Sequence, residues 1–262
     1  MNIKDQTGKI PAPLILIVAV LLAVILIGWY MISSNNGNTQ SNKNAAKANT
    51  NTQKPPAGAI PPGAVPPNFA GSVNSPVVVE EFADFQCPQC ANSNPVFTEI
   101  KSLYGSRIKF IFRNFPLAIP AHDKSFDAAV AVEAAGQQGK FWEMQHQLFS
   151  NQQAWTANPN YKQMWADYAK NLGLDVDKFK TDMAGVFTKG RVEADMARGR
   201  GLGVNSTPSL YINEVPVAFP DMNVSKLKEL IDAELQKAAA GNAAPASAPA
   251  APANAAPASA AK

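Results

Sequence analysis

Two cysteines are the side chains of this sequence best suited to covalent chemistry. They are Cys87 and Cys90 in the segment FADFQCPQCANSNP, residues 82–95, and they are the only cysteines among 262 residues. A thiolate can attack a disulfide, and two thiols at this spacing can exchange one with a substrate. A redox pair, half of a metal site and two inert buried thiols are therefore the interpretations to compare.

The residues around the cysteines predict a helix that begins between them. Pro88 fits the first helical turn, where its fixed φ and missing N–H carry no penalty, and the sequence is compatible with a helix as far as Leu103. Cys87 would then lie at the helix N-terminus, where backbone N–H groups favour a thiolate. Cys90 would lie about one turn inside the helix, and Pro95 would bend it.

Strands and further helices surround this motif. SPVVVEEFADF predicts a buried strand over about 77–82, RIKFIFRNFP predicts a second strand over 107–116, and PSLYIN and VPVAFP predict two more, joined at Asn213-Glu214. Apolar residues at three and four spacing predict several helices between Asp123 and Arg200, and a last one in KLKELIDAELQK. This order predicts an α/β fold with one sheet and helices packed against it.

The N-terminal third has a different composition. Residues 10–32 form an uncharged apolar run long enough to cross a bilayer core of about 30 Å as a helix, and Lys4 and Lys9 precede it. We therefore expect a single-pass anchor with residues 1–9 in the cytoplasm and the remaining chain outside, periplasmic or extracellular. A cleaved signal peptide is the alternative, but its apolar region is usually about 7–15 residues.

Two segments are too poor in large apolar residues to predict a core. Residues 33–75 are rich in Asn, Pro and Gly and predict a disordered tether, and residues 238–262 are nearly all Ala, Pro, Ser and Asn and predict a disordered tail. One domain at 76–237 remains. It contains 17 Lys and Arg against 19 Asp and Glu, so its charge offers no support for nucleic-acid binding.

Residues 76–237 resemble the DsbA-like thiol-disulfide oxidoreductases, which have a thioredoxin fold with a helical insertion. The resemblance rests on the motif Cys87-Pro88-Gln89-Cys90, on Pro95 five residues after it, on Glu81 six residues before it, and on Thr207-Pro208 leading into a late strand. The resemblance implies that the insertion occupies about 121–200. It also implies that Pro208 is cis and faces the cysteines.

The resemblance implies a role for each of these residues. Cys87 is the nucleophile, Cys90 resolves the mixed disulfide, and Glu81, if buried, passes a proton to or from Cys90. Because Glu80 adjoins Glu81, strand alternation leaves open which of the two points inward. Pro88 and Gln89 tune the thiols and meet the substrate, and Thr207 and Pro208 shape a groove in which the Thr207 main chain could pair with an extended substrate.

The same chemistry can run as oxidase, reductase or isomerase. Strong oxidants of this family carry Pro-His between the cysteines, whereas this chain has Pro88-Gln89, so a strongly oxidising potential is in doubt. The expected partners are protein or peptide substrates with thiols or disulfides, a redox protein that recycles the pair, and the membrane through the N-terminal helix. No cofactor and no nucleic acid are expected.

Three other interpretations compete with the redox pair. A zinc site needs about four ligands, and His122 and His146 are the only histidines that could join the cysteines. Inert core thiols need neither the CxxC spacing nor a proline at the helix start. A redox-inactive peptide-binding or chaperone-like module on the same fold remains open, because fold does not dictate function.

Overall fold

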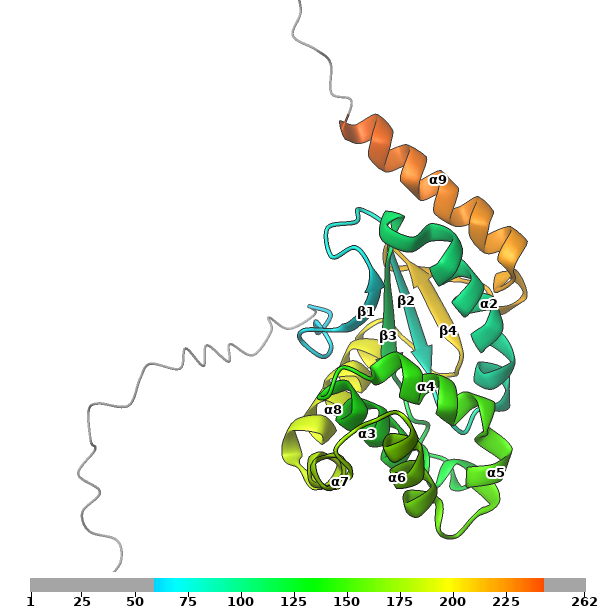
Figure 1. The fold of residues 1–262 in the computed structure, drawn as a ribbon. Helices are drawn as coiled ribbons and strands as arrows, with labels where there is room; N and C mark the ends of the chain where they lie inside the picture. The colour runs from blue at the N-terminus through cyan, green and yellow to red at the C-terminus, as the bar shows by residue number, and fades with distance from the viewer. Residues whose placement is uncertain (1–58, 243–262) are drawn as a thin grey trace, which may run out of the picture. The chain divides into compact units, whose positions relative to one another are not determined.

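The computed structural model describes residues 59–242, and one mixed sheet organises them (Figure 1). Its strands lie in the order β1-β3-β2-β4-β5, with β2 and β3 parallel and the other pairs antiparallel. The strands are β1 (Asn68–Gly71), β2 (Val78–Ala83), β3 (Lys109–Asn114), β4 (Ser209–Ile212) and β5 (Val215–Val217). The four strands expected from the sequence are present, and β1 is additional.

Helices connect and cover these strands. Helix α2 (Pro88–Tyr104) follows β2, and helix α9 (Val224–Asn242) follows β5. The helical insertion between β3 and β4 consists of α3 (Ser125–Gly136), α4 (Phe141–Ser150), α5 (Gln152–Ala157), α6 (Tyr161–Asn171), α7 (Val176–Ala184) and α8 (Val186–Gly201). Short 3₁₀ turns occupy Gly105–Arg107, Pro120–His122 and Phe219–Asp221. The expected helical insertion is confirmed, and its helices run from Ser125 to Gly201.

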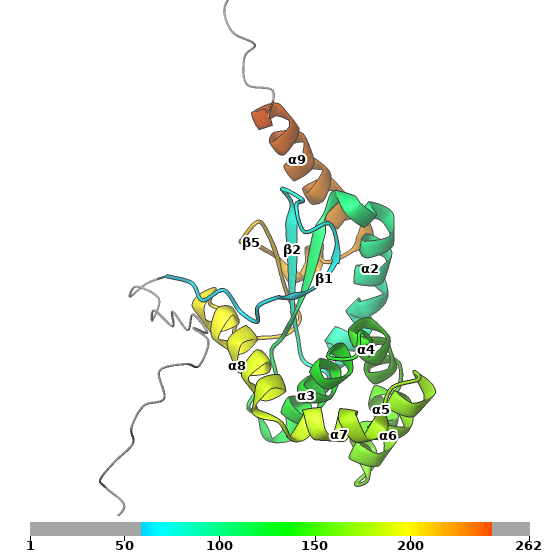
Figure 2. The ribbon, with the colours of Figure 1, turned by 60° about the vertical axis from the view of Figure 1, so that its left-hand side comes forward.

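The two faces of the sheet are buried by different helices. Figure 2 shows α2 and α8 on opposite sides of the strands. On the α2 and α9 side, Val79 packs with Phe97 of α2 and Leu227 of α9. On the other side, Phe82 packs with Phe115 and Tyr211, against partly buried residues that include Met196 of α8. Alternate residues of β2 therefore enter different cores, as the pleat of a strand requires.

The insertion has an apolar core of its own that extends to the cysteines. Trp155 and Trp165 are fully buried in it, with ring centroids 5.3 Å apart. The same cluster includes Phe85, Cys87 and Cys90. The start of α2 is therefore packed directly against the insertion, which makes the insertion part of the cysteine environment.

The prediction that the disordered tether extends to residue 75 is wrong, because residues 59–75 are ordered. Strand β1 pairs with β3, and Ala64 is 3% exposed. The Arg113 guanidinium donates hydrogen bonds to the carbonyls of Pro62 (3.0 Å) and Ala64 (3.1 Å). An arginine distant in sequence thus satisfies the backbone of a Pro-rich segment, and composition cannot reveal such a partner.

The other end of the domain also extends beyond its predicted limit. Helix α9 continues to Asn242, whereas the tail was predicted to begin at residue 238. Ala238, Ala239 and Ala240 are strong helix formers, and the prolines that stop a helix come later in the sequence. The predicted anchor at 10–32, the tether before residue 59 and the tail after 242 lie outside the described residues. Within 59–242, no helix is both long and apolar enough for a transmembrane span.

Candidate active site at the start of helix α2

Cys87 is the N-cap residue of helix α2, as the sequence predicted. Its backbone is extended (φ −72°, ψ 118°), and Pro88 occupies the first helical turn. The backbone N–H groups of Cys90 and Ala91 donate to the carbonyl of Cys87 at 3.1 and 3.3 Å. The helix therefore begins between the two cysteines, and the backbone of Gln89 and Cys90 in its first turn helps to lower the pKa of Cys87.

The two sulfurs differ in their access to solvent. Cys87 is 7% exposed and Cys90 is 0% exposed, and neither forms a disulfide in this structure. Cys87 is less open than expected, but within the pair it alone can be reached from outside. Pro88 and Gln89 are exposed beside it. A substrate sulfur approaching this surface would meet Cys87 first.

The loop before β4 closes over the Cys87 sulfur. The Thr207-Pro208 peptide bond is cis, as the family resemblance implied. Cys87 Sγ lies 3.3 Å from the carbonyl oxygen of Thr207, within hydrogen-bond distance. β4 is hydrogen-bonded to β2, the strand that leads into the cysteine motif. The sheet therefore brings together residues that are 120 positions apart.

The environment lowers the pKa of Cys87 and raises that of Cys90. A hydrogen bond from the Cys90 thiol is the main cause that lowers the Cys87 pKa to about 5, while burial opposes it. The Thr207 side chain adds to the lowering as a lesser cause. Burial raises the pKa of Cys90 well above its usual value. Cys87 is thus a thiolate at neutral pH, and Cys90 is a protonated thiol.

Glu81 is the inward-facing acid of the Glu80-Glu81 pair. It is fully buried on the α2 side of β2, and neither carboxylate oxygen has a hydrogen-bond partner within residues 59–242. Burial raises its pKa to about 7, and the positive charge of Lys101 partly opposes this effect. Glu80 faces the other side, where Arg113 and Arg198 bind it at 2.5 and 2.7 Å. The structure thereby resolves the choice that strand alternation left open.

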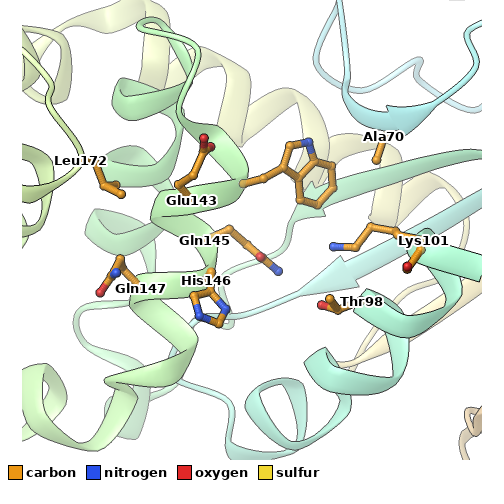
Figure 3. Close-up of a pocket in the computed structure, with 10 residues that line it drawn as sticks. Ala70, Thr98, Lys101, Glu143, Gln145, His146, Gln147 and Leu172 are labelled. Carbon is orange, nitrogen blue, oxygen red and sulfur yellow. The ribbon is translucent and has the colours of Figure 1, made fainter. Parts of the chain in front are cut away.

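Lys101 lines a cavity and acts electrostatically on the buried acid. It lines a space of about 590 Å³ between α2 and α4, and its Nζ lies 4.1 Å from the ring centroid of Trp142. Figure 3 shows Lys101 of α2 and Gln145 of α4 pointing toward each other across this space. Burial lowers the pKa of Lys101, and the charge of Glu81 opposes that shift. Neither cysteine lines the cavity, so it lies behind the reactive surface.

The helical insertion also binds the backbone of the cysteine loop. Gln152, in the first turn of α5, donates from Nε2 to the carbonyls of Phe85 (2.7 Å) and Cys87 (2.9 Å). Sequence reasoning missed Gln152 and Lys101, because a glutamine or lysine on a helix carries no local signal for a contact with another element.

The two histidines considered for zinc are engaged elsewhere. His122 Nδ1 is 2.7 Å from Asp84 Oδ2, and His146 Nε2 is 3.4 Å from Ser150 Oγ. Within the part of the chain that the structure describes, no three His, Cys, Asp or Glu side chains are grouped as metal ligands. The geometry around the cysteines is that of a thiol pair under a proline loop.

Comparison with known proteins agrees with this geometry. The sequence model of the family described as Thioredoxin matches residues 64–233, about two thirds of the chain. The chain belongs to the thioredoxin family. The match includes the cysteine motif, the helical insertion and the Thr207-Pro208 loop, and it begins before the predicted boundary at residue 76, in agreement with the ordered segment at 59–75.

Curated relatives share this thioredoxin region within much longer proteins. The Na(+)/H(+) antiporter NhaA 1 of Mycolicibacterium vanbaalenii is 35% identical over 147 residues, which are 55% of this chain and 23% of the antiporter. The Na(+)/H(+) antiporter NhaA 3 of Salinispora tropica is 34% identical over 143 residues, 55% of this chain and 21% of the antiporter. The chain thus spans less than a quarter of the curated relatives it matches, and transport is an activity of those longer proteins.

Solved structures of thioredoxin-like proteins superpose on the domain. Oxidised BdbD of Bacillus subtilis is 25% identical with a TM-score of 0.53, over 68% of this chain and 98% of BdbD. The α-DsbA1 protein of Wolbachia pipientis is 20% identical with a TM-score of 0.58, over 67% of this chain and 94% of that one. A thioredoxin-like oxidoreductase of Silicibacter pomeroyi is 24% identical with a TM-score of 0.55, over 65% and 92%. These similarities support a DsbA-like version of the thioredoxin fold.

Proposed function

We propose that this protein is a membrane-tethered thiol-disulfide oxidoreductase that acts on protein substrates outside the cytoplasm. The observation that carries the proposal is the placement of Cys87, at the N-terminus of α2 and 3.3 Å from the Thr207 carbonyl, with its pKa lowered to about 5. Two inert core thiols would have no reason to differ in this way. The low pKa of Cys87 favours an accessible thiolate, and the raised pKa of Cys90 favours a buried thiol.

The chemistry is a pair of sulfur exchanges. A substrate thiolate attacks Cys87 Sγ of the Cys87-Cys90 disulfide, and a mixed disulfide forms as the Cys90 sulfur leaves and takes up a proton. A second substrate thiolate then attacks the substrate sulfur of the mixed disulfide, and Cys87 leaves as a thiolate. The substrate loses two electrons to the pair, and a partner redox protein reoxidises it. The exposed Pro88 and Gln89 and the Thr207-Pro208 loop form the surface that receives the substrate.

The proton that Cys90 requires can come from Glu81. Because burial raises the Cys90 pKa, its sulfur leaves readily only when a proton is supplied. Glu81 has a pKa of about 7 and therefore can hold or release a proton near neutral pH. Lys101, whose positive charge acts on this acid, lines the cavity between α2 and α4.

The Cys87 pKa favours the oxidising direction. A sulfur with a low pKa is a good leaving group, and a stabilised thiolate favours the reduced enzyme. The value of about 5 lies between those of about 3.5 and about 7 that are typical of a strong oxidant and of a reductant in this fold. We therefore propose a disulfide donor that is weaker than enzymes with Pro-His between the cysteines.

Turnover and redox potential test this function. The full-length protein should oxidise a reduced two-cysteine peptide in the presence of oxidised glutathione, and Cys87→Ser should abolish that activity. Equilibration with glutathione should place the Cys87-Cys90 potential between about −120 and −270 mV, nearer the oxidising limit. Peptide binding that persists in Cys87→Ser, with no turnover by the parent protein, would instead indicate the redox-inactive binding module.

Localisation is a separate part of the proposal and has its own test. Its support is the apolar run at 10–32, which follows Lys4 and Lys9. The full chain should remain in the membrane pellet after alkaline carbonate washing, and a chain lacking residues 10–32 should not. Protease added to spheroplasts should degrade the domain at 59–242. Protection of that domain until the cells are lysed would contradict an extracytoplasmic location.

A further inference from the structure

Asp84 is a buried carboxylate on the loop between β2 and α2, three residues before Cys87. Its Oδ1 accepts hydrogen bonds from the Gln86 backbone N–H (2.7 Å) and from Ser125 Oγ (2.5 Å). Its Oδ2 accepts from the Leu117 backbone N–H (2.8 Å) and lies 2.7 Å from His122 Nδ1. Both carboxylate oxygens are therefore saturated, and three of the four partners come from the segment that leads into the helical insertion.

The backbone of the same residue contacts the reactive pair. The Cys87 N–H donates to the Asp84 carbonyl at 3.1 Å, and a hydrogen bond with the Asp84 backbone stabilises the Cys90 thiolate form. Gln86 reinforces the connection, because its Oε1 accepts from the backbone N–H of Lys124 (2.5 Å) and from Ser125 Oγ (3.2 Å). Asp84 thus has its side chain bound to residues 117–125 and its backbone bound to both cysteines.

We propose that Asp84, with His122 and Ser125 bound to its carboxylate, is a positioning residue through which the helical insertion sets the placement and reactivity of the Cys87 sulfur. This inference deepens the proposed function and rests on it. Asp84 acts through the loop and touches no substrate. Because the Asp84 carboxylate and backbone fix the loop that ends at Cys87, losing one of these hydrogen bonds displaces the Cys87 sulfur from the helix N-terminus that favours its thiolate.

The test compares the chain's two histidines. His122→Ala removes one bond to Asp84, while His146→Ala removes a residue that contacts only Ser150 by hydrogen bond among the described residues. The readout is the pH profile of iodoacetamide alkylation in the reduced, full-length protein. It reports Cys87, because Cys90 is buried and its pKa is raised. The titratable groups facing the loop are Asp84, His122, Asp123 and Lys124.

His122→Ala should raise the alkylation midpoint by about half a unit or more, which is about a threefold loss of rate on the acidic limb. His146→Ala should leave the midpoint unchanged. In an Asp84→Asn background, which already weakens the connection, the further effect of His122→Ala should disappear. If Asp84→Asn does not fold, Ser125→Ala replaces it and should shift the midpoint in the same direction as His122→Ala.

An unchanged alkylation midpoint in both His122→Ala and Ser125→Ala would overturn the proposal, even if the melting temperature fell. Asp84, His122 and Ser125 would then stabilise the fold without affecting the reactivity of Cys87. The measurement requires no substrate. Failure of the proposed function would appear as absent turnover in the unmodified protein, whether or not the Cys87 midpoint responds to His122. The two failures are therefore distinguishable.

Discussion

The Cys90 thiol donates a hydrogen bond to the Cys87 sulfur, and this contact is the largest cause of the lowered Cys87 pKa. The buried partner of the pair therefore activates the accessible one before any disulfide chemistry begins. Its own burial keeps the Cys90 proton in place as the pH rises. The Cys87 thiolate can therefore react with a disulfide, and the proton that remains on Cys90 stabilises that thiolate.

Removing this donor should raise the pKa of Cys87. Cys90→Ala has no group that can donate, whereas Cys90→Ser keeps a hydroxyl at the same position, so it is the matched control. We expect the Cys87 midpoint, followed by thiolate absorbance near 240 nm, to rise by about one unit or more in Cys90→Ala relative to Cys90→Ser. Equal midpoints in the two variants would show that the helix N-terminus alone stabilises the thiolate.

Thr207 should make a smaller contribution to the same thiolate. Thr207→Val has nearly the same shape and lacks the hydroxyl, while Thr207→Ser retains it. Thr207→Val should raise the Cys87 midpoint by less than Cys90→Ala does, because the Thr207 hydrogen bond is a lesser cause of the shift. The same titration measures both. A shift in Thr207→Ser as large as in Thr207→Val would show that loss of the hydroxyl is not the cause of the shift.

Glu81→Gln should stabilise the domain at high pH and slow its chemistry. The folded-state pKa of Glu81 is about 7, above its usual 4.5, so the stability associated with the protonated acid is fully present below about pH 4.5 and is lost as the pH rises through about 7. Glu81→Gln removes this loss and should gain up to about 3 kcal/mol at pH 8, because the pKa of about 7 already includes the attraction to Lys101. Urea unfolding at pH 4 and pH 8 measures the difference.

Near pH 4.5 the two proteins should unfold at similar urea concentrations, since Glu81 is then protonated in the folded state. A constant offset at both pH values would contradict the assigned pKa. Slower exchange in Glu81→Gln, strongest for the step in which Cys90 leaves, would support the proton role. Unchanged turnover would exclude that role while leaving the pKa intact.

Lys101→Met should raise the pKa of Glu81. It removes the positive charge that partly counteracts burial, so the pKa of Glu81 should rise further above 7. Infrared titration of the carboxyl band, assigned by its absence in Glu81→Gln, measures this. Lys101→Arg retains the charge and serves as the control. If Lys101→Met and Lys101→Arg give the same Glu81 pKa, the pair is not coupled electrostatically.

The ionic cluster on the other sheet face should matter for stability. Arg113 binds Glu80 (2.5 Å) and Asp195 (2.9 Å), and all three are buried. Arg113→Met should destabilise the domain by about 3–5 kcal/mol, because it removes the arginine that pairs with the buried Asp195 and one of the two that pair with Glu80. Lys237→Met, at the exposed pair with Glu234, should cost less than about 1 kcal/mol. Urea unfolding compares the two, and similar losses would show that the Arg113 cluster adds nothing beyond a surface ion pair.

The sequence by itself predicted the helix start at the cysteine motif, the helical insertion and four of the five strands. Pro88 after Cys87 indicates a helix start, and the switch from strand to helical periodicity after residue 120 indicates the insertion. Both are local properties: a proline in the first turn and apolar spacing along one element depend on near neighbours in the chain. The predicted limits failed where order depends on distant partners, as at 59–75, where Arg113 satisfies the backbone of Pro62 and Ala64.

Only the tertiary structure decided how the cysteines are tuned. Alternation along β2 could not distinguish Glu80 from Glu81, because both faces of this sheet are covered, and the packing of α2 and α8 makes the choice. The contact of Cys87 with Thr207 spans 120 positions, and that of Asp84 with His122 spans 38. A pKa is set by burial and by the few groups within hydrogen-bond reach, and the folded chain assembles those groups from segments that are far apart in sequence.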